Sequence, residues 1–169
     1  EQIDKKKPFL QWLNPKNNHQ YNWEEVTEKI YKFSYKIKSL IKEGDRVLLL
    51  SENRPEWLIA DLAIMNAGGI TVPIFTTYSE RDYEHILKDC SPSLVIVSND
   101  VQLEKIKKFI DNKKIISFEK IKTLSITFEN IFNEKYEKKI NNKLNRKLPA
   151  CIIYTSGTSG NPKGVILSH

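Results

Sequence analysis

Cysteine, arginine and long apolar runs are scarce in this chain, and each scarcity excludes a class of protein. The two cysteines, Cys90 and Cys151, lie far apart and outside any C-x-x-C pattern, which argues against a disulfide framework or a cysteine metal site. This cysteine usage is typical of an intracellular protein. The charge-free stretch at residues 62–79 is interrupted by Gly68 and Gly69 and then becomes polar. It therefore predicts a helix, a glycine turn and a strand rather than a membrane span.

Arginine supplies only four of the 27 basic residues behind the net charge of +6. Nucleic-acid readers favour arginine and gather their basic residues on one face. The lysines here are dispersed, many of them between Lys105 and Lys147 among Asn, Ile and Glu. We interpret them as a solvated surface and predict no nucleic-acid partner. Nucleic-acid binding ranks last among our hypotheses and predicts a steep salt dependence.

The two ends of the chain suggest a piece of a larger protein. With 169 residues and 40% hydrophobic content, the chain can bury the core of one domain. It starts at Glu1 without an initiator methionine or a signal segment, and it stops at His169, two residues after an apolar run. We therefore expect both ends to be cut.

Capping signals and apolar periodicity predict alternating helices and short strands. Helices are predicted over residues 22–44, 53–67, 79–91 and 101–110, and strands over 46–50, 70–75, 94–97, 115–118, 150–154 and 165–167. The opening, residues 1–21, is interpreted as irregular, and residues 119–147 as a surface excursion with a short amphipathic helix around Ile131, Phe132 and Tyr136. The pattern indicates an α/β fold with a mostly parallel sheet flanked by helices on both faces.

Spacings of three and four residues predict which helix sides face the core. Asn22 and Glu25 form a capping-box pattern before the first helix. The predicted core-facing residues are Val26, Ile30, Phe33, Ile37 and Leu40 in the first helix; Leu58, Leu62 and Met65, with Trp57, Ala60 and Ile64, in the second; Tyr83, Ile86, Leu87 and Cys90 in the third; and Val101, Leu103, Ile106 and Ile110 in the fourth.

The residues suited to chemistry lie between the last two predicted strands. Residues 155–164 read TSGTSGNPKG and combine three glycines, four hydroxyl side chains and one lysine. Glycines let backbone N–H groups approach anionic oxygens, hydroxyls add donors, and a lysine adds a positive charge. This composition predicts a polyphosphate site. The alternative is a flexible turn without a ligand. Two to five residues usually suffice to join two strands, so a ten-residue connection favours the phosphate site.

The loop is not the Walker A phosphate loop. That pattern requires G-K-[ST] leading into a helix, whereas Lys163 is followed by Gly164 and then by the strand-like Val-Ile-Leu. We therefore expect the loop to join two strands, without a helix N-terminus to assist the anion.

The stretch YTSGTSGNPKGV, residues 154–165, resembles the nucleotide-binding loop of the adenylate-forming superfamily, which includes acyl-CoA synthetases, luciferases and adenylation domains of peptide synthetases. The usual pattern is [YF]-T-S-G-[ST]-T-G-x-P-K-G-V, and Ser159 is the single departure. The stretches YNWEEVTEKI at residues 21–30, GDRVLLLSENRPEW at 44–57 and DLAIMNAGGITVPIFTTYS at 61–79 are most similar to long-chain fatty acyl-CoA synthetases.

The resemblance implies a two-step reaction. A carboxylate, here a fatty acid, attacks ATP to give acyl-adenylate and pyrophosphate, and coenzyme A then displaces AMP. It also implies Mg²⁺ as a cofactor, with its ligands in later sequence. By the same resemblance, the residues around the β- and γ-phosphates are Thr155, Ser156, Gly157, Thr158, Ser159, Gly160 and Lys163, with Lys163 neutralising phosphate charge.

The resemblance further implies that residues 1–169 form the N-terminal part of the large AMP-binding domain, without its remainder or the C-terminal domain. We expect this piece alone to be inactive. The full protein is expected to be cytoplasmic, with contact at a membrane surface left open, and the sequence carries no prediction of oligomeric state. Two alternatives stay open: activation of another acid (aryl, short-chain or amino), and a non-catalytic nucleotide-binding domain.

The remaining polar candidates receive no chemical role. The histidines His19, His85 and His169 have no partners at metal-ligand spacing, and Asp61 is the only charge between Trp57 and Ser79. Cys90 and Cys151 stand in apolar settings and are interpreted as buried thiols.

Overall fold

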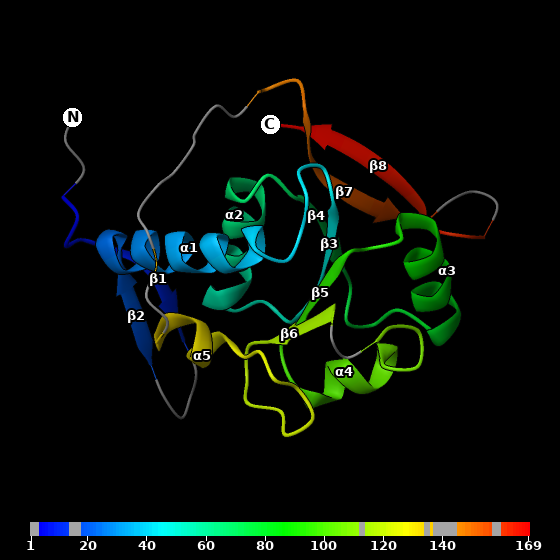
Figure 1. Cartoon of the computed structure of the whole chain (residues 1–169), viewed down its shortest axis with the longest axis horizontal. Coiled ribbons are helices and arrows are strands. Elements are labelled where there is room, and N and C mark those ends of the chain that lie inside the picture. Colours follow the sequence, from blue (N-terminus) through cyan, green and yellow to red (C-terminus); the bar gives the residue numbers. More distant parts are fainter. Residues whose placement is uncertain (1–3, 14–17, 112–113, 134–135, 137–144, 157–159) are drawn as a thin grey trace.

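The chain forms an open α/β sheet with a small antiparallel pair of strands beside it (Figure 1). The computed structural model describes residues 4–13, 18–111, 114–133, 136, 145–156 and 160–169. The helices are α1 (Trp23–Lys38), α2 (Pro55–Asn66), α3 (Glu80–Cys90), α4 (Asp100–Ile106) and α5 (Phe128–Asn133). The strands are β1 (Pro8–Trp12), β2 (His19–Asn22), β3 (Arg46–Leu50), β4 (Ile70–Ile74), β5 (Leu94–Val97), β6 (Ile115–Ser117), β7 (Pro149–Thr155) and β8 (Lys163–Ser168).

The main sheet has the strand order β6-β5-β3-β4-β7-β8. Pairing is parallel between all neighbours from β6 to β7, and only β7 and β8 run antiparallel. The expected fold class, a mostly parallel sheet flanked by helices, is therefore confirmed. Parallel neighbours require crossover connections, and here helices supply them between β3, β4, β5 and β6.

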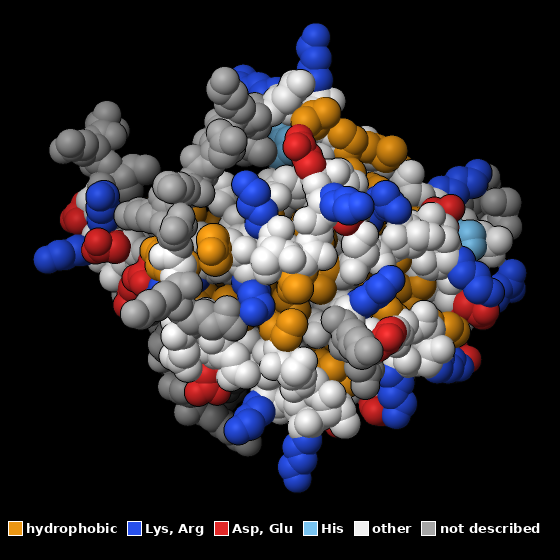
Figure 2. Space-filling view, in the orientation of Figure 1, with side chains coloured by type: hydrophobic (Ala, Val, Ile, Leu, Met, Phe, Trp, Pro, Cys, Tyr) orange, Lys and Arg blue, Asp and Glu red, His pale blue; other side chains and the backbone are white. Residues whose placement is uncertain are grey.

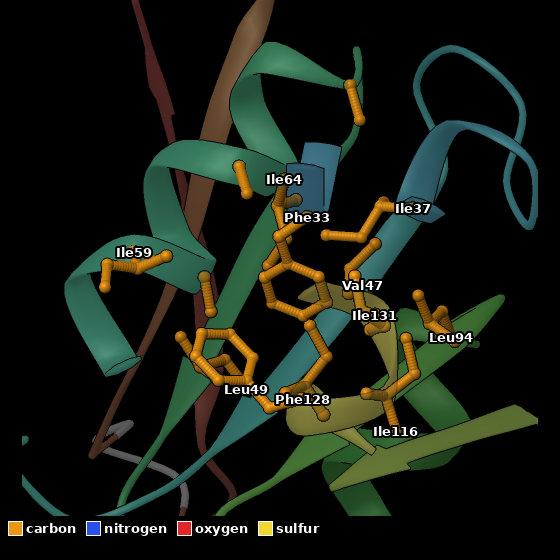
Figure 3. Packing of buried hydrophobic residues seen from close by; sticks show 14 of the residues in the cluster. Phe33, Ile37, Val47, Leu49, Ile59, Ile64, Leu94, Ile116, Phe128 and Ile131 are labelled. Carbon is orange, nitrogen blue, oxygen red and sulfur yellow. The ribbon is translucent and has the colours of Figure 1, made fainter. Parts of the chain in front are cut away.

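Two apolar layers cover the two faces of the sheet. Along β3, Val47 and Leu49 point to one side and pack with α1, α2 and α5. Leu48 and Leu50 point to the other side and pack with α3 and α4. Figure 3 shows the first layer, in which the ring of Phe33 meets that of Phe128 edge-on at 5.2 Å between centroids. Burial of each such ring contributes about 1.5–3 kcal/mol before ordering costs.

Local signals define where the helices begin. The Asn22 side chain accepts from the Glu25 backbone N–H at 2.9 Å, and the Asn22 N–H donates to the Glu25 carboxylate at 2.8 Å, so the predicted capping box is present. Ser79 and Asp82 form a second capping box before α3. Pro55 occupies the first turn of α2, where its missing N–H has no helical partner to lose.

Residues 62–79 divide as the sequence predicted, into the end of α2, a Gly68–Gly69 turn and β4. Gly68 has a φ of +86°, and a Cβ at Gly69 would lie 2.8 Å from Ile41 Cδ1. Among the described residues, no helix combines the length and apolar character needed to cross a membrane.

The interpretation of residues 1–21 as irregular is wrong, because β1 and β2 pair there as antiparallel strands. Aromatic side chains account for the difference. The Phe9 ring stacks on Trp23 at 3.7 Å between centroids, and Trp12 lies against the Arg54 guanidinium at 5.1 Å. Pro8 is tolerated because it is the first residue of its strand. These strands are short and are stabilised by contacts of their aromatic side chains with Trp23 and Arg54. Such contacts leave no periodic pattern in the sequence.

The interpretation of residues 119–147 as a surface excursion is wrong for its first part. Ile121 and Leu124 are buried against the α3–α4 layer, and Phe128 and Ile131 are buried against α1. The short helix is confirmed as α5, although Tyr136 lies beyond its end. The burial could not be inferred from composition, because the apolar residues are widely spaced within a Lys- and Asn-rich segment.

Three predicted core faces also need correction. In α2 the fully buried residues are Ile59, Ala60, Ala63 and Ile64, while Leu58, Leu62, Met65 and Trp57 are only partly buried. Leu40 lies beyond the end of α1 and is 38% exposed. Val101 in the first turn of α4 is 64% exposed, and Ile110 follows that helix. Each miss lies at a helix end or on a helix contacted from several sides, where a single stripe does not define the core.

Candidate functional site

The candidate site is the connection between β7 and β8. These strands pair antiparallel, with Tyr154 opposite Gly164 and Thr155 opposite Lys163. The prediction that the loop joins two strands is therefore confirmed. Gly164 is required by packing, because a Cβ there would lie 2.8 Å from Ile152 Cγ2 and 3.2 Å from the Tyr154 ring.

The predicted phosphate residues fall at the two ends of this connection. Thr155 ends β7, Lys163 begins β8, and both are exposed and face each other across the hairpin. Ser156 follows β7 and is exposed. Gly160 is exposed with a φ of +85°, a backbone conformation that favours glycine. The predicted residues Gly157, Thr158 and Ser159 lie outside the described residues.

Helix α3 lies beside the loop and contacts the chain on both sides of it (Figure 1), through Asn161 and Pro162 before β8 and through Tyr154 in β7. The His85 Nε2 lies 2.9 Å from the Pro162 carbonyl oxygen, and the Arg81 guanidinium donates to the Asn161 side-chain oxygen at 3.3 Å. Before α3, the Tyr78 hydroxyl donates to the Tyr154 carbonyl at 3.2 Å. These contacts were not predicted from the sequence.

Tyr154 fixes the base of the loop to the same helix. Its hydroxyl donates to the Asp89 carboxylate at 2.5 Å, and the side chain is 3% exposed. Burial, followed by the hydrogen bond to Asp89, raises the pKa of the Tyr154 hydroxyl above its ordinary value. The residue is therefore neutral and acts as a donor at physiological pH.

The sequence contained one signal for these contacts. Arg81, His85 and Asp89 are spaced by four residues and therefore share one face of a helix. A polar stripe beside an apolar one is usually solvated, so the signal becomes informative only when α3 is placed against the β7–β8 connection.

A cavity of about 510 Å³ lies next to Tyr154, at the carboxyl ends of β3, β4 and β7. Its lining includes Ser51 and Glu52 after β3, and Thr76 and Thr77 after β4. The chain leaves β3 toward α2 on one face of the sheet and leaves β4 toward α3 on the other. Such a divergence opens a crevice, and ligands of open α/β sheets bind at this edge.

Glu52 supplies the charge at the rim of this cavity. Its carboxylate accepts hydrogen bonds from Ser98 Oγ and Gln102 Nε2, each at 2.6 Å. Burial alone would raise its pKa, but these hydrogen bonds outweigh burial and hold the pKa below its ordinary value. Glu52 is therefore ionised at neutral pH, which makes the rim of the cavity anionic. The positive charge of Lys163 lies at the start of β8, on the far side of the loop from Tyr154.

The described residues contain no group of three or more His, Cys, Asp or Glu side chains that could hold a metal ion. We assign no Mg²⁺ ligand among the residues that the structure describes. The donors at the loop are side-chain hydroxyls and the Lys163 ammonium.

A mostly parallel α/β sheet that ends in a strand–loop–strand unit with this glycine, hydroxyl and lysine pattern defines the class of adenylate-forming enzymes. Comparison with protein-family models agrees: the model described as AMP-binding enzyme matches residues 2–169. The chain belongs to the AMP-binding enzyme family.

The curated relatives of this chain include long-chain-fatty-acid–CoA ligases. The long-chain-fatty-acid–CoA ligase ACSBG1 of Bos taurus is 31% identical over 147 residues, which cover 79% of this chain and 20% of that protein. The chain spans about a fifth to a quarter of the length of the curated relatives it matches.

Solved structures show the same fold. ATP-bound MatB from Rhodopseudomonas palustris superposes with a TM-score of 0.80 at 21% identity, covering 100% of this chain and 33% of that one. The o-succinylbenzoate coenzyme A synthetase MenE from Bacillus subtilis, in complex with AMP, gives a TM-score of 0.71 at 19% identity over 90% of this chain and 37% of that one.

Proposed function

We propose that residues 1–169 are the N-terminal part of the large AMP-binding domain of an ATP-dependent fatty acid–CoA ligase. The observation that carries this proposal is the β7–β8 connection, because it places Thr155 and Lys163 opposite each other, both exposed, at the ends of the glycine- and hydroxyl-rich loop. We also propose that the full-length enzyme contains the remainder of that domain and a C-terminal domain.

The loop is proposed to hold the β- and γ-phosphates of ATP. The proposed contacts come from Thr155, Ser156, Gly157, Thr158, Ser159 and Gly160. Lys163 is proposed to balance the negative charge that grows on pyrophosphate as it departs. Its exposed place at the start of β8 supports this role, since no described acid pairs with it in a salt bridge.

The proposed chemistry has two steps. A carboxylate oxygen forms a bond to the α-phosphorus of ATP, the bond between that phosphorus and the bridging oxygen breaks, and pyrophosphate leaves with the electron pair. The coenzyme A thiol then loses its proton to water, and its sulfur bonds to the acyl carbon. The bond between that carbon and the phosphate oxygen breaks, and AMP leaves with the electron pair. Adenylation is needed because a free carboxylate is a poor acyl donor at neutral pH. Mg²⁺ bound with ATP is proposed to offset phosphate charge.

A fatty acid is the proposed substrate, and the names of the curated relatives support it. An aryl acid is the second candidate, supported by the likeness to o-succinylbenzoate coenzyme A synthetase. We further propose a cytoplasmic enzyme without a nucleic-acid partner. Figure 2 supports the second point, since lysine and arginine are scattered over the face shown, with acidic residues among them.

The test is an assay of the protein at its full natural length with ATP, Mg²⁺, coenzyme A and one acid at a time. The acids are a series of fatty acids of increasing chain length, benzoate, acetate and an amino acid. We expect AMP and acyl-CoA to form in equal amounts with fatty acids. Product from benzoate alone would favour the aryl alternative, and no AMP with any acid would reject the proposal.

A further inference from the structure

Helix α3 contacts the chain on both sides of the loop. Asp89 accepts a hydrogen bond from Tyr154 on the β7 side, while Arg81 and His85 contact Asn161 and Pro162 on the β8 side. We propose that His85 is a positioning residue for ATP binding: by holding the Pro162 carbonyl, it fixes Lys163 in the place where that lysine meets the phosphates. This inference rests on the proposed function.

The chemistry of the His85 contact makes it directional. A carbonyl oxygen can only accept, so the Nε2 of His85 carries the hydrogen and donates it across the 2.9 Å to Pro162. His85 is half-buried and Pro162 is buried, so water competes only weakly for this bond.

Pro162 is well suited to transmit this contact. Its ring fixes φ near −65°, so a hold on its carbonyl also sets the direction in which the chain enters Lys163. The carbonyl of residue 162 and the nitrogen of residue 163 share one peptide plane, which leaves little freedom between the contact and the lysine backbone. A shift of the Pro162 carbonyl therefore moves the Lys163 backbone with it.

Comparison with the neighbouring contacts indicates that His85 is the residue that holds the β8 side of the loop. The Arg81 bond to Asn161 is long, at 3.3 Å, and both side chains are exposed, so it contributes little. Tyr154, anchored on Asp89, fixes the β7 side through its own buried side chain. On the β8 side, His85 is the half-buried donor that reaches the backbone directly.

The experiment uses the full-length protein and three variants of one residue. His85→Ala removes the donor. His85→Gln places an amide N–H close to the position of Nε2, whereas His85→Asn holds its amide nearer the helix, short of Pro162. Lys88→Ala is the matched control, because Lys88 lies on α3 and pairs only with Glu84 of the same helix among the described residues. Each is assayed by ATP–pyrophosphate exchange for KM of ATP and KM of the acid.

We expect the KM for ATP to rise about 2- to 10-fold in His85→Ala and His85→Asn, the effect of one lost hydrogen bond. The KM for the acid should not change, and His85→Gln and Lys88→Ala should behave like the wild type. If His85→Ala does not fold, the Gln and Asn pair gives the comparison.

Two results would overturn the inference alone: an unchanged KM for ATP in an active His85→Asn variant, or a proportional rise of both KM values, which indicates a general structural defect. Absence of exchange in the wild-type protein would instead reject the proposed function, and the inference with it.

Discussion

At the scale of single residues, the site depends on a few groups with contrasting surroundings. Lys163 and Thr155 are exposed at the end of a hairpin, whereas Tyr154, directly before Thr155, is 3% exposed and bonded to Asp89. A ligand site needs exposed donors to contact the ligand and buried neighbours to hold those donors in place.

Lys163 gives the sharpest residue-scale prediction. We expect Lys163→Ala to lower the rate of ATP–pyrophosphate exchange by about 100-fold, because the variant loses one positive donor to the departing pyrophosphate. Lys88→Ala serves as the matched control, since Lys88 is also an exposed lysine near this region, with its side chain 75% exposed. An exchange rate for Lys163→Ala equal to that of the control would remove Lys163 from the mechanism.

The two thiols are predicted to be unreactive at neutral pH. Burial raises the pKa of Cys90 to about 11, and burial together with the charge of Asp61 raises that of Cys151 to about 11. Relative to the ordinary value of 9.0, this lowers the thiolate fraction at pH 8 by about 100-fold. Iodoacetamide labelling, followed by peptide mass spectrometry, should be slow and should keep accelerating above pH 9. Cys90 is buried, as the sequence predicted, whereas Cys151 is only half-buried, so that interpretation was wrong for Cys151. Rapid labelling of either thiol at about pH 7.5 would contradict the raised pKa values.

The candidate site was only half predictable from the sequence. The glycines, hydroxyls and lysine of the loop form a local pattern that suits phosphate binding, so Thr155 and Lys163 could be predicted as candidates from the sequence. His85 could not, since its contact with Pro162 joins residues 77 positions apart and depends on where α3 packs.

At the scale of elements, capping and turn residues determined most boundaries. The strands β3 and β5 have the residue ranges that the sequence predicted, because each contains four consecutive apolar residues and lies between turn signals. β1, β2 and the buried residues after β6 were missed, since a few aromatic and aliphatic side chains among polar ones form no periodic pattern. Their stability comes from contacts with distant elements.

The capping box of α1 yields an element-scale prediction. Asn22→Ala removes the acceptor for the Glu25 N–H and should lower the free energy of unfolding by about 1 kcal/mol. Urea unfolding measures the loss, and Asn22→Ser is the control, because serine keeps an oxygen able to accept the same bond. Equal loss in both variants would show that the cap does not stabilise the helix.

At the scale of the whole molecule, the sheet ends in an exposed apolar strand. Val165, Ile166 and Leu167 of β8 are 47%, 63% and 49% exposed, and Figure 2 shows hydrophobic side chains along the position of β8. Exposed apolar surface of this kind usually marks an interface. Since the chain spans about a fifth to a quarter of its curated relatives, we propose that further sequence of the same enzyme completes the site beyond β8.

This proposal predicts that the 169-residue chain alone does not activate acids. An isolated preparation should show no acid-dependent ATP–pyrophosphate exchange, because groups for adenine, ribose and Mg²⁺ are proposed to come from outside it. The full-length protein, assayed at equal concentration, is the positive control. A measurable rate in the isolated chain would contradict the proposal.

We propose that this chain belongs to an enzyme that activates fatty acids through acyl-adenylates. The most direct measurement is exchange of labelled pyrophosphate into ATP by the full-length protein without coenzyme A, since only the first step can then run. We predict exchange that depends on added fatty acid. Absence of exchange with every acid of the panel, in protein shown to be folded, would contradict the claim.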